Sequence, residues 1–281
     1  MVARLAGYFR LVHPFPSALD AVAAGAIALI AGADASLATR LALGMLGLQF
    51  AIGTANDLAD APLDALNRPG KPLPAGLVGP LGADAVLFVA AGAGLLSAAS
   101  AGPAALAVGI LGLADGLVYD VRLKGTALSW LPFAGGVALL PVYAWLGAAG
   151  TLPGAFWGIV PLALLAGAVL AVANALADLD RDTEAGVVSI ATILGRDRAI
   201  AADAAGLALL LVVVVLSSAA AGFVGAALPV ELAGGGLGLV GLGLSASPNG
   251  QVGRLGWEVQ AIGIVAVGAG WLAVLVSAGL L

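Results

Sequence analysis

The sequence contains no cysteine and only one histidine, His13. Without cysteine the chain has no disulfide, no thiolate metal site and no cysteine nucleophile. One histidine is too few for a His-based zinc site or a catalytic histidine network. Any metal that the protein binds must therefore be a hard ion held by oxygen ligands.

Charged residues are also scarce. They make up 10% of the 281 residues, whereas 62% of the residues are hydrophobic and the mean hydropathy is +1.11. Soluble globular chains are about one quarter charged and about half apolar, so this composition excludes a soluble fold and predicts an integral membrane protein. The formal net charge of −5 is not a surface field, because seven of the sixteen acids lie in two short segments where bound cations would neutralise them.

Long apolar stretches are abundant, and a stretch of about 17–25 residues is enough to cross a bilayer. Gly and Ala dominate these stretches, and small residues let membrane helices pack closely. We therefore expect an all-α polytopic membrane bundle of about nine transmembrane helices around a central cavity open to the cytoplasmic side. The predicted spans, with 199–244 divided at Gly222-Phe223, are 15–32, 38–56, 81–100, 103–119, 127–149, 154–176, 199–221, 223–244 and 259–280. Residues 1–281 form one domain of two pseudo-repeated halves, with Asp-rich motifs near 56–64 and 174–182.

The basic residues predict the orientation of these spans. With nine crossings, ten of the eleven Lys and Arg residues fall on the side of the N-terminus, and only Arg40 falls on the other. Such a bias marks the cytoplasmic side. The segment before the first span, with Arg4, Arg10 and His13-Pro14-Phe15-Pro16, favours an interfacial lead-in over a cleaved signal peptide. We expect a cell-membrane protein with its N-terminus and polar chemistry on the cytoplasmic side.

Two acidic segments share one spacing, Asn-x3-Asp-x3-Asp. Steps of four residues advance only about 40° around a helix, so each set lies along one stripe. Asp57 lies close to the first stripe, whereas Asp180 points away from the second. The residues of the two stripes are Asn56, Asp60 and Asp64, and Asn174, Asp178 and Asp182.

Carboxylates one helical turn apart repel each other unless a cation lies between them. Magnesium prefers oxygen ligands and commonly bridges a few carboxylates to substrate phosphates. We therefore predict that both stripes bind Mg²⁺ and clamp one diphosphate. Solvated helix ends with ordinary capping acids are the alternative, which the matching spacing of the two segments disfavours. Cations that could grip the diphosphate follow the first segment and the fourth span: Arg68, Lys71, Arg122 and Lys124.

These residues resemble the motifs of the UbiA superfamily of intramembrane prenyltransferases. The first family motif is nearly complete from Asn56 to Gly76, with Asn67-Arg68-Pro69-Gly70-Lys71-Pro72-Leu73-Pro74 after the acids. The second appears as Asp178 and Asp182 trailed by Ala185-Gly186 and Leu194-Gly195. A Tyr-x3-Lys-like element is present loosely, because Lys124 lies five residues after Tyr119, and either Arg122 or Lys124 would take its basic role.

The resemblance implies a Mg²⁺-dependent prenyltransferase. Such an enzyme transfers a prenyl or polyprenyl group from an allylic diphosphate to an aromatic or other lipophilic acceptor, as in quinone or prenyl-lipid biosynthesis. It implies a polyprenyl diphosphate, a small acceptor and the bilayer as partners, with no nucleic acid and no obligate protein partner. Magnesium would be held by Asp57, Asp60, Asp64, Asp178 and Asp182 with Asn56 and Asn174. The substrates would be bound by Arg68, Lys71, Tyr119, Arg122, Lys124, Arg181 and Arg10.

Three other functions remain to be weighed. A prenyl ether synthase of the (di)geranylgeranylglyceryl phosphate type is an alternative within the same chemistry. A cation-coupled transporter would carry its acids near the bilayer midplane at broken helices, whereas these acids lie at helix ends. A CDP-alcohol phosphotransferase would require Asp-Gly-x2-Ala-Arg, and Asp115-Gly116 is not followed by that pattern.

Overall fold

The structure is a computed structural model that describes residues 2–222 and 227–281. Within these ranges it contains helices and no strand, which confirms the predicted all-α class. Eight of the described helices are long and apolar enough to cross a membrane, and a ninth span results if the bent pair α1 (Val2–Leu11) and α2 (Pro14–Ile30) is counted as one. The prediction of about nine spans is therefore confirmed. The predicted break at Gly222-Phe223 lies partly outside the described residues.

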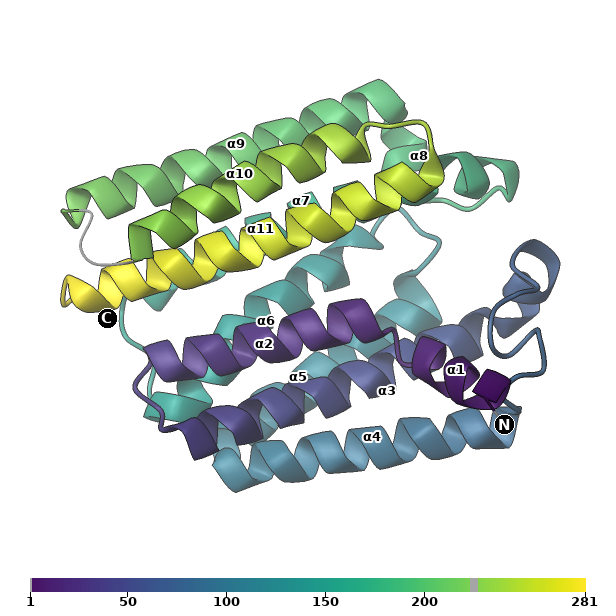
Figure 1. The fold of residues 1–281 in the computed structure, drawn as a ribbon, viewed down its shortest axis with the longest axis horizontal. Coiled ribbons are helices and arrows are strands. Elements are labelled where there is room, and N and C mark those ends of the chain that lie inside the picture. Colours follow the sequence, from purple (N-terminus) through teal and green to yellow (C-terminus); the bar gives the residue numbers. More distant parts are fainter. Residues whose placement is uncertain (1, 223–226) are drawn as a thin grey trace. The chain divides into compact units, whose positions relative to one another are not determined.

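The chain separates into two compact units, and unit 1 comprises residues 1–122 and 143–150. Figure 1 shows α2, α3 and α4 running side by side, in purple to blue. The last turns of α6 (Trp130–Ala149) also belong to this unit. Its remaining elements are α3 (Ala35–Asn67), α4 (Pro80–Ala101), α5 (Pro103–Val118) and the π-helical turn η1 (Tyr119–Leu123), of which Leu123 already belongs to unit 2.

Helices α3 and α4 touch through glycines. A Cβ atom added to Gly47 would lie 2.8 Å from the Cα of Gly94, which is closer than a side-chain carbon can approach. The two backbones therefore meet directly, as small residues allow in membrane bundles. The Gly-rich composition of the predicted spans is thus used for close helix packing.

Helix α3 is longer than its apolar part. It has 33 residues, so it extends about 50 Å, well beyond the roughly 30 Å of a bilayer core. The predicted span ended at residue 56, and the helix continues without interruption through Pro62 to Asn67. The first acidic segment is therefore the helical continuation of a membrane span.

Unit 2 comprises residues 123–142 and 151–281. Figure 1 shows α10 and α11, in green and yellow, lying side by side. Helix α7 has 29 residues and likewise carries the second acidic segment at its end. Leu176, Leu179, Ala191 and Ala199 form a buried cluster that joins this end to the next two helices. Besides most of α6, the unit contains α7 (Phe156–Glu184), α8 (Ile190–Leu194), α9 (Arg196–Ala220), α10 (Ala227–Ser245) and α11 (Gly250–Ser277).

The exposed faces of the helices are apolar. Trp157 is 89% exposed, Leu81 85% and Phe88 71%. Large exposed apolar side chains are unfavourable in water and suit a surface covered by lipid. The helices thus bury small residues against one another and present large apolar residues outward, as an integral membrane protein does.

Candidate active site

The first acidic segment lies at the end of α3 in unit 1. Asp57 and Asp64 are buried, with 3% and 4% of their surface exposed, and Asp60 is half-buried. Asp57 and Asp64 are seven residues apart, so they project from the same face two turns apart. The helix ends at Asn67, and the backbone N–H of Arg68 donates to the carbonyl oxygen of Asp64. The loop that follows therefore starts directly beside the carboxylates.

Lys71 of this loop joins the two buried acids. Its Nζ lies 2.8 Å from Asp57 Oδ1 and 2.8 Å from Asp64 Oδ2, and 17% of its side chain is exposed. Arg68 Nε is 4.0 Å from Asp64 Oδ1. A charge that is shielded from water needs a paired charge close by, because desolvation is costly. The basic loop thus folds back onto the acidic segment, and sequence analysis had assigned both to the same substrate group.

A short apolar cluster fixes the same loop to the surrounding helices. Leu11, Val78 and Ala83 are buried together, and Leu58 and Leu73 pack against them. These residues come from the end of α1, the loop after α3, the start of α4 and α3 itself. The position of Lys71 is therefore supported by the packing of Leu73 and Val78, which follow it in the loop.

Two residues near the N-terminus contact the acidic segment and the loop that follows it. His13 Nε2 lies 3.0 Å from Asp57 Oδ1. Arg10 donates from Nη2 to the carbonyl oxygen of Gly70, at 2.9 Å. Arg10 was predicted from the family resemblance to bind substrate, whereas no role was predicted for His13. The only sequence signal for His13 was its place in the polar lead-in just before the first span.

Asn56 contacts the π-helical turn η1 that follows α5. Its Nδ2 donates to Asp120 Oδ1 at 2.7 Å, and Asp120 is buried within the π-helical turn. Sequence analysis had passed over Asp120. Tyr119 is half-buried and Arg122 is exposed in unit 1, whereas the half-buried Lys124 belongs to unit 2. The turn therefore ties one predicted metal ligand, Asn56, to the segment that carries the Tyr-x3-Lys-like element.

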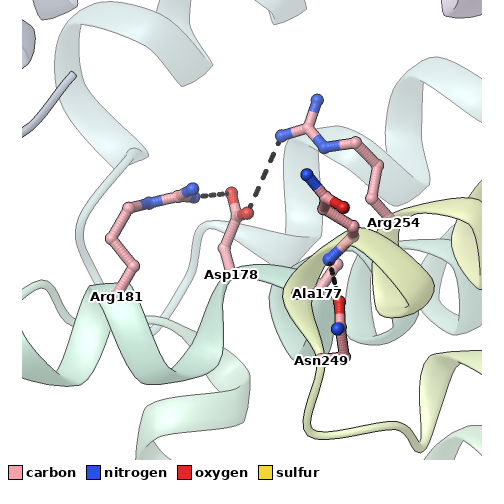
Figure 2. Close-up of a pocket in the computed structure, with 7 residues that line it drawn as sticks. Ala177, Asp178, Arg181, Asn249 and Arg254 are labelled. Atoms are coloured by element: carbon pink, nitrogen blue, oxygen red, sulfur yellow. Dashed lines mark hydrogen bonds and ion pairs between the residues drawn. The ribbon is translucent and has the colours of Figure 1, made fainter. Parts of the chain in front are cut away.

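The second acidic segment lies at the end of α7 in unit 2, beside an open pocket of about 570 Å³. Figure 2 shows Asp178 between two arginines: Arg181 pairs with its Oδ2, and Arg254 Nη2 lies 3.9 Å from its Oδ1. Asn174 and Asp182 are half-buried on the same helix. Arg254 comes from α11, far along the chain, and sequence analysis had assigned it only a topological role. The pocket is lined by Ala177, Asp178, Arg181, Asn249, Gly250, Gln251 and Arg254.

Asp180 lies apart from this pocket, as its helical angle predicted. Its carboxylate pairs with Arg196, whose Nη2 lies 2.8 Å from Oδ1 and 2.9 Å from Oδ2. The side chain of Asp180 is 66% exposed, so this pair is a surface contact of small energetic effect. The structure therefore separates Asp178 from Asp180, although only one residue lies between them.

The donor atoms in both segments suit a hard cation. They are carboxylate and amide oxygens, and the sequence offers no thiolate. Among the described residues no three acidic or histidine side chains are grouped so as to hold a metal ion by themselves. Magnesium in proteins commonly uses one or two carboxylates and completes its coordination with water and substrate phosphates. The residues present fit that mode of binding.

Comparison with known proteins identifies the family. The model of the UbiA prenyltransferase family matches residues 19–250. A digeranylgeranylglyceryl phosphate synthase of Halobacterium salinarum is 34% identical over 219 residues, which are 70% of this chain and 72% of that protein. A protein of the same name from Methanopyrus kandleri is 34% identical over 122 residues, and this match spans less than half of either protein, 43% of this chain and 45% of the relative.

Solved structures share the fold. A UbiA homolog from Aeropyrum pernix K1 has a TM-score of 0.75 at 23% identity, over 90% of this chain and 96% of that one. A UbiA homolog from Archaeoglobus fulgidus, bound to DMAPP and Mg²⁺, has a TM-score of 0.65 at 18% identity, over 74% of this chain and 76% of that one. The motif resemblance and the all-helical membrane fold are thereby confirmed. The chain belongs to the UbiA prenyltransferase family.

Proposed function

We propose that the protein transfers a prenyl group from an allylic diphosphate to the free hydroxyl of a singly prenylated glyceryl phosphate. The donor half rests on one observation: each Asp-rich segment has basic side chains in contact with its carboxylates, Lys71 in unit 1 and Arg181 in unit 2. Such a mixture of acids and bases suits a metal-bound diphosphate better than a free cation. The acceptor half is supported by relatives named digeranylgeranylglyceryl phosphate synthase.

The chain's own residues act on the leaving group. When the allylic C–O bond breaks, its electron pair moves onto the diphosphate, and Arg68, Lys71 and Arg181 stabilise that charge. The acceptor hydroxyl oxygen then forms a bond to the allylic carbon, and its proton passes to the released pyrophosphate, so that the products are an ether and pyrophosphate. The allylic cation must be kept from water, and the apolar helices provide that shielding. Arg254 adds a second guanidinium on the wall of the unit 2 pocket.

The proposed metal ion is Mg²⁺. Bound Mg²⁺ would neutralise charge on the diphosphate and so favour its departure. In this proposal each stripe supplies a few oxygen ligands to Mg²⁺, and water and diphosphate complete the coordination. The ligands are Asn56, Asp60 and Asp64 in unit 1, and Asn174, Asp178 and Asp182 in unit 2. UbiA homologs from Archaeoglobus fulgidus bound to Mg²⁺ with DMAPP or with GPP support Mg²⁺ as the metal ion.

The side of the membrane follows from charge. Ten of the eleven basic residues fall on the side of the two Asp-rich segments, so we infer that these segments face the cytoplasm of a cell-membrane protein. A soluble diphosphate would then reach the site from the compartment where it is made. Transfer to an aromatic acceptor, as in quinone biosynthesis, remains the competing prediction for the acceptor.

The test uses the purified protein in lipid nanodiscs with MgCl₂ and geranylgeranyl diphosphate. Two acceptors are compared, a singly geranylgeranylated glyceryl phosphate and 4-hydroxybenzoate. We expect pyrophosphate release and a doubly prenylated lipid, identified by mass spectrometry, with the first acceptor only. Turnover with 4-hydroxybenzoate alone would overturn the acceptor assignment, and no pyrophosphate release with either acceptor would count against the proposed reaction.

A further inference from the structure

The junction between α1 and α2 has an unusual backbone. His13 has φ 49° and ψ 66°, and it is the only non-glycine residue with positive φ among those described. The two helices meet there at a bend of 54°, and α2 starts at Pro14. A left-handed backbone is unfavourable for a residue with a side chain and persists only where surrounding contacts hold it. The contacts of the His13 side chain therefore indicate what stabilises this backbone conformation.

The imidazole of His13 fits against α3. A Cβ atom added to Gly53 would lie 3.1 Å from His13 Cδ2, so the ring packs closely on Gly53 and would have to shift to admit a side chain there. One turn further along α3, Asp57 Oδ1 lies 3.0 Å from the ring nitrogen Nε2 of His13, within hydrogen-bonding distance. The imidazole ring therefore packs on Gly53 with its carbon atoms and meets the carboxylate of Asp57, one turn along α3, with its Nε2 atom.

Asp57 links His13 to Lys71. The same oxygen, Oδ1, that meets His13 also lies 2.8 Å from Lys71 Nζ. Arg10, three residues before His13, holds the carbonyl oxygen of Gly70 next to Lys71. The junction is therefore linked to Lys71 indirectly in two ways, through its partner carboxylate Asp57 and through the backbone of the preceding residue, Gly70.

We propose that His13 is a positioning residue that, through Asp57, sets the Lys71 ammonium for the diphosphate. This inference rests on the proposed function, in which Lys71 binds that group. A side chain held in one geometry by its neighbours loses less entropy when the ligand arrives, so its contribution to binding is larger. A purely structural His13 would affect stability and leave the affinity for diphosphate unchanged.

The experiment measures binding of inorganic pyrophosphate to the full chain in nanodiscs with MgCl₂, by calorimetry, so it requires no acceptor and no turnover. His13→Asn keeps a residue that tolerates the left-handed backbone but is too short to reach Asp57. We expect it to weaken pyrophosphate about tenfold, the effect of losing one hydrogen bond to a charged group. His13→Gln keeps a donor of similar reach, and we expect it to restore affinity to within about threefold.

A double-mutant cycle shows whether the effect runs through the lysine. If it does, adding His13→Asn to Lys71→Met changes affinity less than about twofold, because the group to be positioned is gone. Gln49→Leu is the matched control, since Gln49 Nε2 donates to Asp20 Oδ2 at 2.6 Å and also joins α3 to α2. We expect this variant to lower thermal stability and leave pyrophosphate affinity unchanged.

The possible outcomes distinguish failure of the proposed function from failure of the positioning role of His13. Failure of the wild type to bind pyrophosphate with Mg²⁺ would count against the proposed function itself. With a binding wild type, the positioning role is overturned by unchanged affinity in His13→Asn, by additive effects of His13→Asn and Lys71→Met, or by an equal loss in Gln49→Leu. Should His13→Asn not fold, His13→Gly replaces it in the same measurements, because glycine tolerates the left-handed backbone and carries no ring. A tenfold loss of affinity that disappears on the Lys71→Met background supports the role, and unchanged affinity contradicts it.

Discussion

The two Asp-rich segments have the same spacing and very different surroundings. In unit 1 the carboxylates of Asp57 and Asp64 are buried and held by Lys71 from the adjacent loop. In unit 2 Asp178 has 23% of its side chain exposed, faces an open pocket, and meets arginines from its own helix and from α11. A shared helical pattern thus produces one enclosed ion-pair network and one accessible site. Mutations should separate stability from ligand binding differently in the two.

The largest effect is expected at the accessible site. Asp178→Ala should reduce prenyl transfer by about a thousandfold or more, because it removes a ligand for the ion that stabilises the departing diphosphate. Expression and thermal stability should stay near those of the wild type, since the carboxylate is partly exposed. Pyrophosphate release and thermal unfolding in nanodiscs measure the two effects. Turnover retained by this variant and by Asp60→Ala would refute the metal assignment.

In the enclosed network the same kind of change should cost stability. Lys71→Met leaves Asp57 and Asp64 buried without their shared cation, and breaking a buried pair destabilises a protein by about 3–5 kcal/mol. We expect a lower unfolding temperature together with weaker diphosphate binding. Thermal unfolding with and without Mg²⁺ checks this. An unfolding temperature equal to that of the wild type would mean that the two carboxylates are not a linked network.

A smaller effect is expected from Arg254 on the pocket wall. Arg254→Met should weaken pyrophosphate binding about tenfold, the effect of losing one charge-assisted contact, and it should leave stability unchanged because the side chain is 58% exposed. Arg196→Met is the matched control, since Arg196 pairs with Asp180 outside the pocket. Equal losses in the two variants would point to a general charge effect instead of a pocket contact.

The smallest effect is expected at Asp180, two positions after Asp178, where the largest effect is expected. Asp180→Asn removes an exposed ion pair with Arg196, and such pairs contribute about 0–1 kcal/mol. Turnover should match the wild type within about twofold, and the unfolding temperature should scarcely change. Kinetics measured beside Asp178→Ala give the contrast directly. A large loss of turnover would place Asp180 in the catalytic machinery and contradict its separation from Asp178.

Much of the architecture could be predicted because membrane spans follow from local composition. The apolar stretches were located to within a few residues, with three exceptions. Helices α3 and α7 continue past their apolar parts, and α11 begins at Gly250, nine residues before the span predicted at 259–280. The face of a helix was also predictable, and Asp180 does point away from Asp178. The basic residues of the loop after α3 were expected to bind the same diphosphate as the acidic segment, and Lys71 does contact both Asp57 and Asp64.

Contacts between distant segments could not be predicted. His13 reaches Asp57 across 44 residues, Asn56 reaches Asp120 across 64, and Arg254 approaches Asp178 from another helix. His13, Asp120 and Arg254 are each unremarkable in their own stretch of sequence, because a single polar residue near a helix end is equally compatible with solvent. Its partner is chosen by how the helices pack, which no local pattern encodes.

The sequence by itself determined the membrane class, the helical spans, the two Asp-rich stripes and the family, because hydropathy and residue spacing act over a few helical turns. Only the tertiary structure decided that Asp57 and Asp64 are enclosed with Lys71 while Asp178 faces an open pocket. It also decided that His13 contacts Asp57 and that Arg10 contacts Gly70 in the loop of Lys71. The physical reason is burial. Whether a carboxylate is sealed with a lysine or faces a pocket depends on the helices and loops that cover it, and these come from elsewhere in the chain.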